Sequence, residues 1–119
     1  MSVPKSGVVA ALWTPTREDG SIDMSGLFSN LEFLKDKGVT GFMILGSTGE
    51  FARLDLSTRL DCLSVLRHLA EEYPTVVNAS AIRPAEAIAV GKRAKELGFG
   101  SVALLAPWFY ALAQPDIAE

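Results

Sequence analysis

The stretch at residues 41–51, GFMILGSTGEF, decides how the rest of the chain folds. Its first half, residues 41–45, is a short apolar run, which is typical of a strand buried on both faces. GSTG follows at residues 46–49, where Gly46 and Gly49 allow a sharp turn and a close approach to a ligand. Backbone N–H groups and two adjacent hydroxyl groups in such a turn suit an anion, such as a carboxylate or a phosphate. A plain strand-to-loop turn of small residues would have the same sequence. Short glycine motifs are therefore weak evidence for an anion site.

Three further apolar runs predict strands at residues 7–12, 75–80 and 101–106, the second of which begins with residues 75–77 and finishes in Asn78, Ala79 and Ser80. The strand starts recur at a spacing of roughly thirty residues, which is typical of βα units. The runs are continuous and do not alternate with polar residues. They therefore indicate a parallel sheet that is covered on both faces or closed into a barrel.

Helical patterns separate these strands. The first begins at a cap, Asp23, and ends before Gly38; the second is expected to begin at Ser57 and to end at Pro74. The third has Pro84 in its first turn and Gly98 just beyond its end. We expect Gly91 to let this helix pack closely on the sheet, on an inner face made of Ala87, Ile88, Gly91, Ala94 and Leu97.

Composition narrows the class of protein. With 119 residues, of which 49% are apolar, the chain is predicted to form one small globular domain. A net charge of −3 without a basic cluster argues against nucleic acid, and the apolar runs are too short to span a membrane. The single cysteine, Cys62, fits a reducing compartment such as the cytoplasm and is expected to be a buried thiol. With one histidine, His68, expected at the surface or half-buried, we expect no metal site.

Small polar residues end each of the first three strands: Thr14, Ser47, Thr48, Asn78 and Ser80. Parallel strands place such residues at one edge of the sheet, the carboxyl edge, where βα architectures build their sites. We therefore expect the functional site at that edge.

Four segments together resemble the dihydrodipicolinate synthase/N-acetylneuraminate lyase family of class I aldolases. They are LWTPTREDGSID at residues 12–23, GFMILGSTGEFARL at 41–54, VVNAS at 76–80 and APWFY at 106–110. The resemblance covers nearly the whole chain. It implies an α/β fold that is the N-terminal half of a (β/α)8 TIM barrel, with four parallel strands and three complete helices, truncated after the fourth strand.

The resemblance also implies the chemistry. The family binds pyruvate or a related 2-oxo acid, and a lysine in its sixth strand forms a Schiff base, which serves as an electron sink; no separate cofactor is expected. By position, Ser47 and Thr48 match the hydroxyl pair that holds the substrate carboxylate, with help from the N–H groups between Gly46 and Gly49. Ser47 also matches the proton-relay hydroxyl. Thr14 would support the site from below, and the full-length parent is expected to be a homo-oligomer.

Two departures from the family pattern change what the chain can do. The family often has Pro-Tyr-Tyr where this chain has Pro107, Trp108 and Phe109, and phenylalanine cannot relay a proton. Tyr110 is one position further on and would point to the opposite face of a strand. This weakens a strict synthase assignment and favours a broader 2-oxo acid lyase or hydratase.

The second departure is the missing lysine. The strand that carries it is absent, and Lys5, Lys35, Lys37, Lys92 and Lys95 are expected in the N-terminal tail or on solvated helix positions. We therefore expect a fragment of a 2-oxo acid-dependent aldolase or lyase that holds the carboxylate and is inactive alone. One alternative is a noncatalytic half-barrel that assembles with itself or with a partner chain through its unpaired edges. Another is a phosphate cradle, although GSTG lacks the lysine and the glycine spacing of a P-loop.

Overall fold

The computed structural model describes residues 6–108, 113 and 115. Within them, the order of elements is β1 (Val9–Ala11), α1 (Met24–Asp36), β2 (Gly41–Ile44), η1 (Phe51–Arg53), α2 (Leu56–Val65), α3 (Leu69–Glu72), β3 (Thr75–Asn78), α4 (Pro84–Glu96) and β4 (Ser101–Ala103). The four strands form one parallel sheet in the order β1-β2-β3-β4. Each strand thus pairs with the next one along the chain, as in successive βα units.

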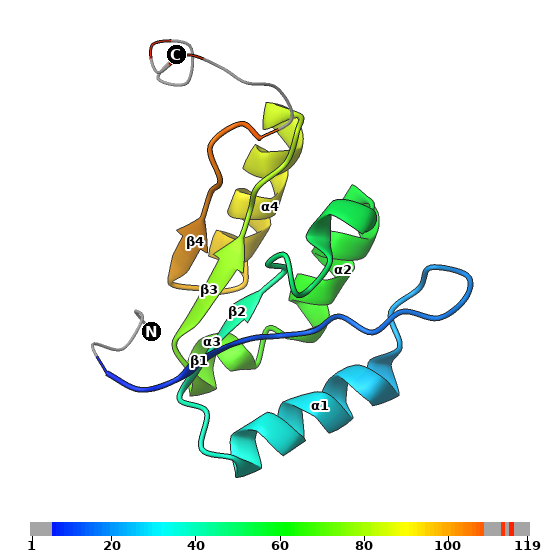
Figure 1. Ribbon diagram of the computed structural model, residues 1–119, viewed down its shortest axis with the longest axis vertical. Helices are drawn as coiled ribbons and strands as arrows, with labels where there is room; N and C mark the ends of the chain where they lie inside the picture. Colours follow the sequence, from blue (N-terminus) through cyan, green and yellow to red (C-terminus); the bar gives the residue numbers. More distant parts are fainter. Residues whose placement is uncertain (1–5, 109–112, 114, 116–119) are drawn as a thin grey trace.

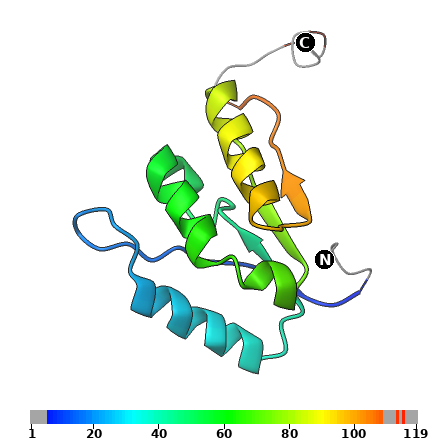
Figure 2. The same ribbon diagram turned by 180° about the vertical axis from the view of Figure 1, so that it is seen from behind.

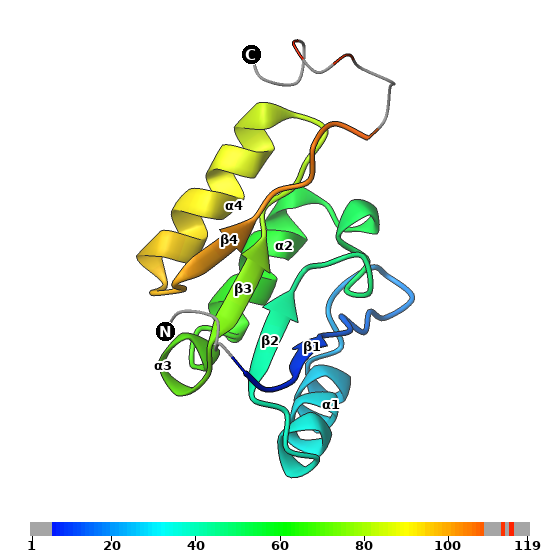
Figure 3. The same ribbon diagram turned by 60° about the vertical axis from the view of Figure 1, so that its left-hand side comes forward.

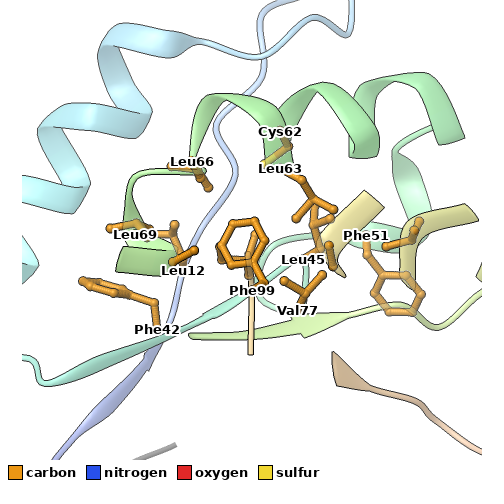
Figure 4. Close-up of a cluster of buried hydrophobic side chains, with 14 of the residues drawn as sticks. Leu12, Phe42, Leu45, Phe51, Cys62, Leu63, Leu66, Leu69, Val77 and Phe99 are labelled. Atoms are coloured by element: carbon orange, nitrogen blue, oxygen red, sulfur yellow. The ribbon is translucent and has the colours of Figure 1, made fainter. Parts of the chain in front are cut away.

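The helices lie on one side of this sheet, as opposite views show (Figures 1 and 2). The buried face is apolar: Phe42, Ile44 and Val77 point from the two central strands and are at most 1% exposed. Figure 4 shows Val77 and Leu45 facing Cys62 and Leu63 of α2 across this core. The apolar stripes of the helices therefore explain why the sheet is covered on this side.

The opposite face of the sheet remains open (Figure 3). Strand register places Met43 beside Val76 and Asn78 beside Ala103 on that face. Because side chains alternate along a strand, these residues point away from the helices. Of the two expected arrangements, a sheet covered on both faces is therefore wrong for the described residues, because Val9 of β1 points to the open face and is 39% exposed. Val102 of β4 lies beside Val77 on the helix side, and it is 51% exposed because β4 is an edge strand.

The predicted strands are too long at three ends. The ladder begins at Val9, two residues after Gly7, β3 ends at Asn78, before Ser80, and β4 ends at Ala103, although the apolar run continues to Ala106. An edge strand forms hydrogen bonds with a neighbour on one side only. An apolar run in the sequence therefore does not by itself show how far the strand pairing extends.

The predicted second helix is two helices. Its cap is Asp55, whose side chain accepts a hydrogen bond from the N–H of Thr58, so the expected cap at Ser57 is wrong. Helix α2 ends at Val65, and α3 begins at Leu69. Leu66 and Leu69 nevertheless remain fully buried, because the apolar stripe continues through the break.

The predicted inner face of α4 is partly wrong. Val90 and Ala94 are buried, whereas Ile88 is 58% exposed. A Cβ atom at Gly91 would meet nothing within 4 Å, so this glycine is not required for close packing. The buried stripe follows residues three and four apart through Val90 and Ala94, and Ile88 lies off that stripe.

Candidate functional site

The turn that follows β2 is closed by its own backbone. The N–H of Glu50 donates to the carbonyl of Ser47 at 3.0 Å, and the N–H of Phe51 donates to the carbonyl of Gly46 at 3.4 Å. The left-handed residues are Leu45 (φ 60°) and Glu50 (φ 56°), one on each side of GSTG. The expectation that the two glycines supply the sharp bend is therefore wrong, because neither has a positive φ.

Gly49 serves close packing instead, whereas Gly46 does not. A Cβ atom at Gly49 would lie 3.0 Å from the carbonyl oxygen of Leu12 and 3.1 Å from Oγ1 of Thr14. Gly49 therefore lets the turn rest on the end of β1. At Gly46 the nearest contact would be Sδ of Met43 at 3.4 Å, an ordinary contact distance.

The turn presents unused donors. Among the described residues, none accepts a hydrogen bond from the backbone N–H groups of residues 46–49. The side chains of Ser47 and Thr48 are exposed, and each carries a hydroxyl group. Successive free N–H groups form a concave site for an anion, so this arrangement suits a carboxylate or a phosphate.

A small cavity lies beside the turn on the open face of the sheet. Its volume is about 90 Å³, and its lining is formed by Met43, Gly46, Ser47, Asn78, Ala103, Leu104 and Leu105. The structure thus brings Gly46 and Ser47 to the cavity. Thr48 and Gly49 are outside its lining, and Thr14 is buried at 2% exposure beneath the turn. The roles assigned to these five residues stay predictions.

Asn78 lines the cavity, and the sequence analysis placed it at this edge of the sheet without assigning it a role in the site. Its Nδ2 donates to the carbonyl of Leu45 at 2.7 Å, and its Oδ1 accepts from Oγ of Ser80 at 2.6 Å. Oγ of Ser80 in turn accepts from the N–H of Leu105 at 2.8 Å. The available signal was a polar residue at the end of an apolar strand, but only the tertiary fold shows which neighbours it joins.

A partly buried ion pair supports this network from the helix side. The guanidinium of Arg59 is 5% exposed, donates to Glu86 at 2.9 Å and to the carbonyl of Ser80 at 3.4 Å. Its Nε has no partner among the described residues. The pair lines a second cavity of about 200 Å³, where the ring of Trp108 meets that of Phe51 edge to face at 5.8 Å.

No described lysine lines the cavity beside the turn. Lys35 forms ion pairs with Glu32 at 3.1 Å and Glu72 at 3.4 Å. Partial burial alone would lower the pKa of Lys35, but these carboxylates outweigh it and raise the pKa above its usual value. Lys92 and Lys95 are exposed on α4. Lys5, Phe109 and Tyr110 lie outside the described residues.

Cys62 and His68 lie away from the turn. Burial raises the pKa of the Cys62 thiol to about 12, which keeps it protonated and a poor nucleophile. His68 is half-buried, and its ring stacks on that of Phe28 at 5.9 Å. Both predictions from the sequence are confirmed. Within the described ranges, no helix is long and apolar enough to cross a bilayer.

Comparison with known proteins shows which family the chain matches. A model of the "Dihydrodipicolinate synthetase family" matches residues 4–119. The 4-hydroxy-tetrahydrodipicolinate synthase of Methanococcoides burtonii is 33% identical over 103 residues, which are 87% of this chain and 35% of that protein. The chain therefore spans little more than a third of the length of this curated relative.

Solved structures agree on the fold. The dihydrodipicolinate synthase of Bacteroides thetaiotaomicron superposes with a TM-score of 0.87 at 29% identity, over 98% of this chain and 40% of that one. YagE, a prophage protein of Escherichia coli K12, superposes with the same TM-score of 0.87 at 22% identity, over 97% of this chain and 39% of that one. The expected half of a (β/α)8 barrel is confirmed.

Proposed function

Because this chain belongs to the dihydrodipicolinate synthetase family, we propose that it forms the carboxylate-binding part of a class I aldolase or lyase that acts on a 2-oxo acid. The turn at residues 46–49 carries this proposal: among the described residues its backbone N–H groups and two hydroxyl groups have no hydrogen-bond partner, and Gly46 and Ser47 line a small cavity. The crystal structure of YagE holds pyruvate, which has the carboxylate that such a turn suits. The cavity of about 90 Å³ favours a compact acid.

Each residue has a stated role in this proposal. The hydroxyl groups of Ser47 and Thr48 and the N–H groups from Gly46 to Gly49 hold the substrate carboxylate. The hydroxyl of Ser47 also stands at the proton-relay position. Thr14 supports the turn from below, where its Oγ1 approaches Gly49. A Schiff-base lysine outside this chain then performs the covalent step, since a protonated imine accepts electrons from the adjacent carbon.

The first test measures pyruvate binding to the chain by two-dimensional NMR. We expect pyruvate to shift the amide signals of residues 46–49, with saturation in the millimolar range. Ser47→Ala or Thr48→Val should weaken binding by roughly tenfold, because each removes a hydrogen bond to a charged group. Ser29→Ala is the matched control, since Ser29 is an exposed serine on α1. Equal binding by all the variants would contradict the proposal, and tighter binding of inorganic phosphate would favour the phosphate cradle.

The second test asks whether the chain alone performs the covalent step. Incubation with pyruvate and borohydride, followed by intact mass measurement, should yield no adduct, since no described lysine lines the cavity. A stable adduct on this polypeptide would overturn the proposal that the covalent lysine lies elsewhere. Cytoplasmic location and homo-oligomerisation belong to the same proposal for the full-length parent.

A specific observation favours a second candidate, a noncatalytic half-barrel that pairs with a second copy or a partner chain. Within the described residues, strands β1 and β4 each pair on one side only, and the segment after β4 exposes Leu104 and Leu105 by 67% and 54%. Unpaired strand edges with apolar side chains favour association. Light scattering distinguishes the two candidates, because a well-folded monomer would contradict self-assembly.

A further inference from the structure

Leu45 occupies a conformation that needs support. It follows β2 directly and has φ 60°, in the left-handed region that residues with a side chain rarely adopt. Such a conformation persists only where the surrounding structure holds it. Its own side chain is fully buried, and its carbonyl receives a hydrogen bond from Nδ2 of Asn78 at 2.7 Å.

Asn78 is itself fixed in one orientation. Its side-chain oxygen accepts from Oγ of Ser80 at 2.6 Å and from the N–H of Ser80 at 3.3 Å, so its nitrogen faces Leu45. Asn78 and Ser80 are 3% and 1% exposed, which shields these bonds from competing water. The N–H of Leu105 completes the network from the segment after β4.

The geometry points to Asn78 as the positioning residue of the anion-binding turn, an inference that rests on the proposed function. The carbonyl of Leu45 and the N–H of Gly46 belong to one planar peptide. By holding that carbonyl, Asn78 fixes the plane of the first N–H of the turn and the direction in which residues 46–49 leave β2. The ends of three strands thereby set the orientation of the donors that meet a carboxylate.

The test combines two readouts on the whole chain. Backbone chemical shifts of Leu45 report its left-handed conformation without any ligand, and pyruvate titration reports binding. In Asn78→Ala, we expect the Leu45 shifts to leave the left-handed range and pyruvate binding to weaken by roughly fivefold to tenfold. Ser80→Ala should have the same effects to a smaller extent, and it serves as the second variant if Asn78→Ala does not fold.

Thr75→Ala is the matched control, because Thr75 begins the strand that Asn78 ends. Thr75 is 1% exposed, and its hydroxyl donates to the carbonyl of Tyr73 at 3.0 Å, far along β3 from the turn. Its loss should lower thermal stability while leaving the Leu45 shifts and pyruvate binding unchanged. If Thr75→Ala weakens binding as much as Asn78→Ala does, general destabilisation explains the effect and the inference is wrong.

The remaining outcomes separate this inference from the proposed function. Unchanged Leu45 shifts in both Asn78→Ala and Ser80→Ala would overturn the positioning role, even if the unsubstituted chain binds pyruvate. If the unsubstituted chain does not bind pyruvate, the proposed function fails. The Leu45 shifts still decide in that case whether Asn78 holds the turn.

Discussion

Gly49 and Gly91 are the same residue type in opposite surroundings. Neither has a positive φ, so their difference lies in the space around them. A Cβ atom at Gly49 would press on the backbone of Leu12 at 3.0 Å, whereas one at Gly91 would meet nothing within 4 Å. From the sequence we expected close packing at Gly91, in a helix, but the structure shows it at Gly49, in the turn.

We therefore predict opposite effects of two alanine substitutions. Gly49→Ala should lower the free energy of unfolding by about 1–3 kcal/mol, because it overpacks the contact between the turn and β1. Gly91→Ala should raise it by up to about 1 kcal/mol, because alanine favours the interior of a helix. Denaturant unfolding measures both. A similar loss in the two variants would contradict the contacts described for the turn.

At the scale of the element, caps decide where helices begin. The sequence analysis predicted Ser57 as the cap of the second helix, but the carboxylate of Asp55 accepts the N–H of Thr58 at 2.7 Å. This backbone hydrogen bond holds the pKa of Asp55 below its ordinary value of 3.8. A lowered folded-state pKa means that the ionised group stabilises the fold above about pH 4, and that this contribution is lost as the pH falls through the folded-state value.

We predict a pH-dependent difference between two substitutions at this cap. Asp55→Ala should lower the thermal midpoint at pH 7, because it removes the cap oxygen. Asp55→Asn keeps an acceptor without a titrating charge, so its midpoint should fall less than that of the unsubstituted chain between pH 5 and pH 2. Thermal unfolding across this range provides the measurement. Parallel curves for the unsubstituted chain and Asp55→Asn would show that the carboxylate does not stabilise α2 as described.

At the scale of the whole molecule, helices cover one face of the sheet, and β1 and β4 have an unpaired edge among the described residues. Val102 and Leu104 are 51% and 67% exposed at the β4 edge. If the half-barrel self-associates, this edge is the expected contact. The double substitution Val102→Lys and Leu104→Lys should then shift the chain toward the monomer, as measured by light scattering.

Ile88→Lys is the control for this prediction, because Ile88 is comparably exposed, at 58%, but belongs to α4 and not to the sheet. It should leave the association state unchanged. An equal effect of both changes would indicate nonspecific association through exposed apolar side chains. If neither variant changes the association state, the β4 edge is excluded as the contact.

The sequence by itself determined the alternation of strands and helical segments, the parallel sheet and the edge at which the GSTG turn lies. These features depend on local periodicity and on turn residues, which neighbours in the chain specify. Tertiary structure alone decided that Leu45 and Glu50 are the left-handed residues, that Gly49 rests on β1, and that Asn78 joins the turn to Ser80. The contact between Leu45 and Asn78 joins residues 33 positions apart, and Gly49 meets Leu12 from a distant part of the chain, so no local pattern encodes these contacts. Burial and hydrogen bonding between strand ends select them only when the sheet has formed.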